Sequence, residues 1–163
     1  DIMELKNKIV CFYYNNSEID LQNILTTVTD DLGLKIKVYE SGKLDIKIPE
    51  AFRILFEMYL KQSINISRMY TNNSDLILDI AKTNIKELKT LKPIILNKIY
   101  NDTQLEKLIY SMFDNNLNVT KTAQDVYMHR NTINNKLELI KQETTLNLQN
   151  FKDSVAMYLL LKF

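Results

Sequence analysis

The chain has 163 residues, enough for one domain or two small ones, and its 45% hydrophobic content suffices for a buried core. Lys and Arg number 21 against 20 Asp and Glu, which gives a formal net charge of +1. This balance excludes a polycationic nucleic-acid binder but leaves room for a small basic site on a neutral body. The single cysteine, Cys11, excludes an internal disulfide and favours a reducing compartment. Its apolar neighbours predict a buried thiol.

No apolar run approaches the roughly 20 residues of a membrane-spanning helix, and no signal-peptide pattern is present. We therefore expect a cytoplasmic protein without a membrane partner. The first residue is Asp rather than Met, which leads us to expect a fragment of a longer polypeptide.

The first ninety residues predict strands separated by helices. We expect a strand over 8–15, followed by a helix over 20–33 that Asp20 caps and Gly33 ends. A hairpin over 34–50, with its tip at 40–43, leads to a helix over 50–62 whose start is marked by Pro49. A strand over 64–70 and a long helix over 74–90 complete this part. This order, β-α-β-β-α-β-α, predicts an α+β fold class with a small mixed sheet and helices on one face.

Past residue 91 the pattern predicts only helices, and Pro93 marks the expected junction. We place the domain boundary near 91–101. Residues 1–95 would form the α+β domain, with a sensory or dimerisation role, and residues 96–163 a helix-turn-helix domain.

Apolar residues in 102–116 follow the spacing of a helix with one buried face. Asp102 is the expected N-cap of this helix. The stripe consists of Leu105, Leu108, Ile109, Met112 and Phe113. In the next segment, 119–126, Ala123 supplies the small side chain that two closely crossing helices need.

A tight turn at Tyr127 and Met128 is followed by a helix that begins at His129 or Arg130. Tyr127 occupies a turn position that is often Gly. The new helix would bury Ile133, Leu137 and Ile140 and expose Asn131, Asn134, Asn135 and Glu138. A short helix, a turn and a second amphipathic helix make up the helix-turn-helix arrangement.

The polar tip of the second helix suits DNA. A recognition helix enters the major groove by its first turns, where Arg pairs with guanine and Asn with adenine. Thr120, Lys121 and Thr132 have donors that reach phosphates. Residues 118–141 carry four basic against two acidic side chains, so the segment is mildly basic.

The same tip is also compatible with a solvated helix end in a plain helical bundle. His129 fits an N-cap or a surface residue better than a catalytic base or a metal ligand, because the chain has no second histidine and its one cysteine is far away. We therefore expect no catalytic residue, no metal and no cofactor.

The run 115–140 resembles the C-terminal helix-turn-helix of PucR/CdaR-type transcriptional regulators, with a more distant likeness to the Fis-type helix-turn-helix. The match is densest at Asn118-Val119, Ala123 and the run 129-HRNT-132, and 144–163 resembles the closing segment of the family. The resemblance covers about residues 103–163. It implies DNA binding, usually by dimers or larger assemblies.

This sequence departs from the family where Ile133 is followed by Asn134, Asn135 and Lys136 instead of basic and aromatic residues. The change lowers the positive charge and shifts the expected base preference toward A·T pairs. We expect Arg130, Asn131, Asn134 and Asn135 to meet base edges, and Thr120, Lys121, His129, Thr132 and Lys136 to meet phosphates or cap the helix.

In these regulators the DNA-binding end follows a domain distantly like a diguanylate cyclase fold, and the first part of this chain is compatible with a degenerate copy. The hairpin tip 40-ESGK-43 has one acid, one glycine and no phosphate-cradling loop, so no enzyme activity is expected. Three other groups of residues are better explained by structure than by function. The aromatic run Phe12, Tyr13 and Tyr14 could form a stacking platform but fits an ordinary strand, and Phe52, Phe56 and Tyr59 fit a buried helix face. The carboxylates Asp30, Asp31 and Asp45 could form a metal site but fit solvated side chains.

The sequence thus predicts a transcriptional regulator that binds double-stranded DNA as a homodimer. An unidentified small-molecule effector stays open. A protein–protein or dimerisation module with decayed DNA binding is the first alternative, and a nucleotide-handling enzyme ranks last.

Overall fold

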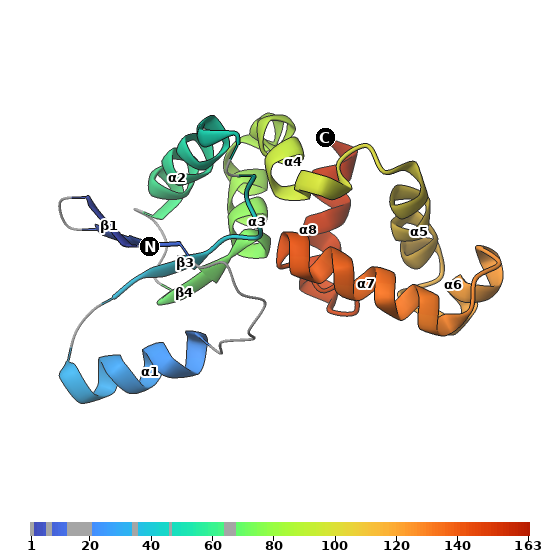
Figure 1. Ribbon diagram of the computed structural model, residues 1–163, viewed down its shortest axis with the longest axis horizontal. Coiled ribbons are helices and arrows are strands. Elements are labelled where there is room, and N and C mark those ends of the chain that lie inside the picture. Colours follow the sequence, from blue (N-terminus) through green and yellow to red (C-terminus); the bar gives the residue numbers. More distant parts are fainter. Residues whose placement is uncertain (1, 6–7, 13–20, 34–35, 46, 64–67) are drawn as a thin grey trace. The chain divides into compact units, whose positions relative to one another are not determined.

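The computed structural model describes residues 2–5, 8–12, 21–33, 36–45, 47–63 and 68–163. The chain forms two compact units, Asp1–Leu34 and Lys35–Phe163. Figure 1 shows the elements from β1 to α8 in chain order. Small sheets with helices precede an all-helical C-terminal part, which confirms the predicted α+β class.

The described residues of the first unit form a two-stranded ribbon and one helix. Strand β1 (Ile2–Leu5) pairs antiparallel with β2 (Lys8–Cys11), and α1 (Leu21–Leu32) follows. Gly33 has φ +62°, which confirms the predicted left-handed stop of this helix. The expected burial of Cys11 is wrong, since a two-stranded ribbon leaves side chains uncovered and Cys11 is exposed. The stretch 13–20, with Asp20 and the tyrosines of the supposed platform, lies outside the described residues.

The second unit begins with a β-α-β arrangement. Strand β3 (Val38–Glu40) pairs in parallel with β4 (Tyr70–Asn72), and the connection runs through α2 (Pro49–Ser63). A parallel pair needs a crossover of this kind. Helix α3 (Asn73–Asn84) follows β4 at once and starts with a capping box between Asn72 and Asp75. The predicted start of α2 at Pro49 is confirmed.

Three predictions about this region are wrong. Residues 41–45 contain no strand, so the expected hairpin is absent, because the segment after β3 bonds to a distant helix instead. The strand expected over 64–70 lies at Tyr70–Asn72, and 64–67 are not among the described residues. The long helix is broken by a 3₁₀ turn (η1, Ile85–Glu87) before α4 (Leu88–Leu96), whose exposed side carries Pro93. Solvent can satisfy the carbonyl that this proline leaves unbonded.

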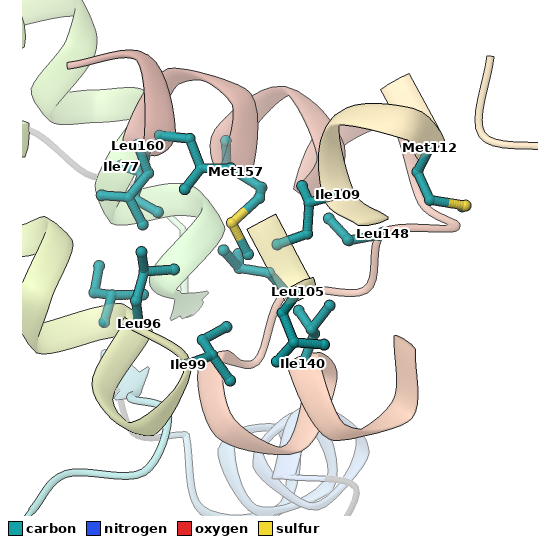
Figure 2. Close-up of a cluster of buried hydrophobic side chains, with 14 of the residues drawn as sticks. Ile77, Leu96, Ile99, Leu105, Ile109, Met112, Ile140, Leu148, Met157 and Leu160 are labelled. Carbon is teal, nitrogen blue, oxygen red and sulfur yellow. The ribbon is translucent and has the colours of Figure 1, made fainter. Parts of the chain in front are cut away.

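The C-terminal helices share one apolar core with α2, α3 and α4. They are α5 (Thr103–Asp114), α6 (Val119–Asp125), α7 (Arg130–Thr144) and α8 (Phe151–Lys162), with a 3₁₀ turn (η2, Asn97–Ile99) before α5. Figure 2 shows Ile77 of α3 and Leu160 of α8 in the same cluster as Ile140 of α7. The predicted boundary near 91–101 lies within this unit. The division into 1–95 and 96–163 stays a prediction.

The aromatic and acidic side chains considered as functional candidates lie in the core or on the surface. Tyr59 packs against the core and stacks on Tyr39, with ring centroids 4.6 Å apart. Phe52 and Phe56 stack on each other in a half-buried position. Asp30, Asp31 and Asp45 are exposed, and the described part of the chain contains no cluster of side chains that could hold a metal ion. Nor is any helix in that part long and apolar enough to cross a membrane.

Tyr39 makes the stability of the second unit sensitive to alkali. Desolvation, together with neighbouring Tyr59, raises the pKa of Tyr39 well above its usual value, and its hydroxyl donates to Asn73 Oδ1. Stability from a group whose pKa is raised on folding is fully present below the unfolded pKa of about 10, and is lost as pH rises from there through the folded pKa.

Tyr39→Phe should therefore flatten the loss of unfolding free energy above pH 10. At pH 7 the variant should be less stable by about 1 kcal/mol, because the hydrogen bond to Asn73 is gone. Urea unfolding between pH 7 and 11 measures both effects. Tyr127→Phe, at a side chain that is 96% exposed, is the matched control and should not change the profile. Equal alkaline slopes in wild type and Tyr39→Phe would contradict the prediction.

Candidate DNA-binding site

Helix α5 and the corner after it hold the first helix of the motif in place. Asp102 Oδ1 accepts from Gln104 N and Leu105 N at 3.0 Å, which confirms the predicted N-cap. The predicted stripe is buried except for half-buried Phe113. Ser111 donates to Asp125 of α6, and Asn115 Nδ2 donates to Asp125 Oδ2 at 3.4 Å. These side-chain bonds fix α6 against α5.

The turn between α6 and α7 is a Schellman motif without glycine. Met128 N donates to Ala123 O at 2.9 Å, and Tyr127 N donates to Gln124 O at 3.3 Å. Tyr127 lies in the left-handed region with φ +53°. Ala123 is buried, as its small size predicted. The turn therefore sets the direction in which α7 leaves α6.

Helix α7 has the two faces that the sequence predicts. Ile133, Leu137 and Ile140 are buried, whereas the predicted outward residues Asn131, Asn134, Asn135 and Glu138 are exposed. His129 is the N-cap, and its Nδ1 accepts from Asn131 N at 3.2 Å. One orphan backbone N–H of the first turn is thus satisfied, and the positive end of the helix dipole faces solvent.

The predicted site residues occupy two helix ends. His129, Arg130, Asn131, Thr132, Asn134, Asn135 and Lys136 lie at the cap and in the first two turns of α7, all exposed except half-buried Lys136. Thr120 and Lys121 are exposed on the first turn of α6, which Asn118 caps by accepting from Lys121 N at 3.0 Å. Because α6 continues for four residues beyond Lys121, about 6 Å of helix separates this pair from the turn before α7.

The cationic side chains of this surface lack an acidic partner among the described residues. No ion pair between those residues involves Lys121, Arg130 or Lys136. Their charges are therefore not neutralised within the described part of the protein. With four basic and two acidic side chains over residues 118–141, this segment is mildly positive on a chain whose net charge is only +1.

Sequence reasoning missed two polar residues beside the outward face of α7. Asn147 and Gln149, from the turn before α8, join Asn134, Asn135 and Glu138 around a shallow polar depression of about 430 Å³. Asn147 Oδ1 accepts from Gln149 N at 3.0 Å, which shapes this turn. The only sequence signal was the polar run 147-NLQN-150, and nothing in it shows which helix it would flank.

Comparisons with known proteins agree with this geometry. Residues 105–163 match the family described as PucR C-terminal helix-turn-helix domain, which confirms the resemblance expected for residues 103–163. A solved structure titled regulator of polyketide synthase expression, from Bifidobacterium adolescentis, is similar with a TM-score of 0.50 and 15% identity. The similarity covers 65% of this chain and 44% of that chain, and at this identity it concerns the fold. No curated protein gives a significant match.

The solved structure covers more of the chain than the helix-turn-helix alone, so its likeness extends into the α+β part. The matched part of this chain spans less than half the length of the chain it resembles. The likeness of the first part to a degenerate cyclase domain stays a prediction.

Tyr127→Gly should stabilise the protein. A left-handed backbone costs an L-residue about 1–2 kcal/mol, whereas glycine costs about 0.5–1 kcal/mol through its flexible unfolded state. The Tyr127 side chain is 96% exposed, so almost no packing is lost. We expect a gain of up to about 1 kcal/mol in unfolding free energy, measured by urea denaturation. Tyr127→Ala keeps the backbone strain and should show no gain. A destabilised glycine variant would contradict the assignment of strain to this position.

Proposed function

We propose that this chain, whose residues 105–163 match the PucR C-terminal helix-turn-helix domain, is part of a transcriptional regulator that reads double-stranded DNA through α7. One observation carries the proposal. The N-terminal turns of α7 expose an arginine and three asparagines, while the opposite face of the helix is anchored in the core. A surface of this composition, fixed by buried apolar side chains, suits the major groove.

Residue roles follow from side-chain chemistry. Arg130 would pair with O6 and N7 of guanine, and Asn131, Asn134 and Asn135 with N6 and N7 of adenine. Thr120 and Lys121 on α6, with Thr132 and Lys136 on α7, would contact phosphates and set the register. His129 caps α7, and its exposed ring is placed for a phosphate contact as well.

A homodimer would give such a reader its selectivity. One helix-turn-helix covers only a few base pairs, and two copies reading half-sites about 34 Å apart, one turn of DNA, multiply the discrimination.

We place the protein in the cytoplasm, with DNA, and assign it no catalysed reaction. The depression of about 240 Å³ beside Lys92 and Tyr100 is smaller than usual small-molecule pockets, so we assign no effector to it.

The alternative, a dimerisation module with decayed DNA binding, has one observation in its favour. Tyr110 of α5 and Tyr158 of α8 are 36% and 44% exposed and both pack edge-on against Phe113. Aromatic side chains of this kind are enriched at protein interfaces. The proposed regulator also requires a dimer, so this surface by itself does not disfavour DNA reading.

Arg130→Ala should lower sequence-selective DNA binding by about 5- to 150-fold, because one bidentate base contact is worth roughly 1–3 kcal/mol. The measurement is fluorescence anisotropy of a duplex that the wild-type chain selects from a randomised 40-base-pair pool, compared with a scrambled duplex. The melting temperature should not change, since Arg130 is exposed and joins no ion pair between described residues.

Lys89→Ala is the matched control for Arg130→Ala. Lys89 is an exposed cation on α4, outside the motif, so its loss removes the same charge from a different helix. Selective affinity should stay within twofold of wild type. Unchanged affinity of Arg130→Ala for the selected duplex would show that α7 is not the recognition helix.

Lys121→Ala should act differently, since a phosphate contact carries no sequence information. Affinity for the selected and scrambled duplexes should fall by similar factors, and the slope of log K against log salt should become shallower by about 1. Anisotropy titrations between 50 and 200 mM salt measure this slope. A loss confined to the selected duplex would instead place Lys121 at a base edge.

A further inference from the structure

Residues far away in the sequence cap the C-terminal end of α7. The last carbonyl groups of an α-helix have no partner within the helix. Lys43 N donates to Glu143 O at 2.9 Å, and Asn73 Nδ2 donates to Thr144 O at 2.9 Å. The segment after β3 and the first residue of α3 therefore close the end of the candidate recognition helix.

Gly42 permits this contact by having no side chain. A Cβ at this position would lie 2.5 Å from Glu143 O and 2.9 Å from Thr144 Cα, both main-chain atoms. No rotamer change can relieve such an overlap. Any larger residue must displace either the segment after β3 or the end of α7.

An ion pair fixes the same junction. Lys43 Nζ lies 3.0 Å from Glu143 Oε1, and the Glu143 side chain is only 5% exposed. A carboxylate this buried depends on its cationic partner. Asn97 Nδ2 donates to Lys43 O at 3.0 Å, which adds a further bond to the lysine backbone. Main-chain, side-chain and charge contacts thus converge on the last turn of α7.

We infer that Gly42, Lys43 and Asn73 are positioning residues for DNA reading: they clamp the C-terminal end of α7 and so set the angle at which its N-terminal turns enter the groove. The inference rests on the function proposed above. Helix α7 has 15 residues, about 22 Å of helix, and moves as a rod, so a shift at the clamped end displaces the base-reading end.

Gly42→Ala, in the complete chain of residues 1–163, tests the clamp. Affinity for the selected duplex should fall at least tenfold, whereas affinity for the scrambled duplex and the salt slope should not change, since the phosphate-contacting side chains remain. Partial unfolding would lower both affinities together. Gly33→Ala is the matched control, because Gly33 has φ +62° but a Cβ added there would have no neighbour within 4 Å. That variant should keep wild-type selectivity.

A second pair of variants keeps the test decisive if Gly42→Ala does not fold. Lys43→Met removes the cation, and this variant should lose selectivity for the selected duplex. Lys43→Arg keeps the charge and the hydrogen-bond donors, and should keep that selectivity. Hydrogen exchange at Thr145 N, which bonds Lys141 O at 2.8 Å, should be faster in Lys43→Met than in Lys43→Arg. This readout follows the last turn of α7 without DNA.

The outcomes separate the two proposals. A wild-type chain that selects no duplex from the pool removes the proposed function, and the clamp inference with it. A selective wild type combined with folded Gly42→Ala and Lys43→Met variants of unchanged selectivity overturns the clamp inference alone. Selectivity lost in those two variants but kept in Lys43→Arg and Gly33→Ala supports it.

Discussion

The helices of the candidate DNA-binding motif depend on a core that they cannot build alone. Helix α6 has seven residues and α5 twelve, and helices this short are marginal in water without tertiary packing. Their apolar faces join one continuous cluster that runs from Leu55 of α2 to Leu161 of α8. The candidate recognition helix is therefore rigid because its buried stripe belongs to the core of the whole second unit. DNA-contacting side chains need such support to hold a fixed geometry.

Several turns between these short helices contain residues with a left-handed backbone conformation. The chain has only two glycines, so other residue types occupy most of these positions. Asparagine, which tolerates this region better than most residues, takes the position at Asn97, Asn101 and Asn116. Leu117, Tyr127 and Thr145 also take it, and Tyr127 does so in the turn before α7. The backbone of Tyr127 is strained, and its conformation sets the direction in which α7 leaves the turn. The local cost is small beside the apolar burial that the turn makes possible.

Charge and polarity are arranged locally instead of being spread over the molecule. The protein is nearly neutral, and the cations Lys121, Arg130 and Lys136 remain outside the ion pairs of the described residues. Lys43, Lys61, Arg68 and Lys152, by contrast, are paired. Most of these paired cations lie in the α+β part. This division leaves cations on α6 and α7 unpaired within the described residues, without making the whole protein basic. It also joins the α+β part to the motif through the ion pair of Lys43 with Glu143.

Local patterns were sufficient for the helices of the C-terminal part. The caps at Asp102 and His129, the buried stripe of α7 and the outward asparagines all follow from residue types at helical spacing, and each is present. The family likeness of residues 105–163 was visible for the same reason, because its motif lies within one continuous stretch. The stop of α1 at Gly33 was equally local.

Tertiary structure decided whatever depends on distant partners. The sequence around Gly42 has the composition of a hairpin tip, yet the backbone of Glu143 and Thr144 occupies the space beside it, and Lys43 bonds to a helix 100 residues away. The parallel pairing of β3 with β4, the exposure of Cys11 and the position of Gln149 beside α7 likewise depend on which segments meet in space. Periodicity shows which face of an element is apolar, but it carries no information about the element that covers that face, since only packing of the complete chain settles it.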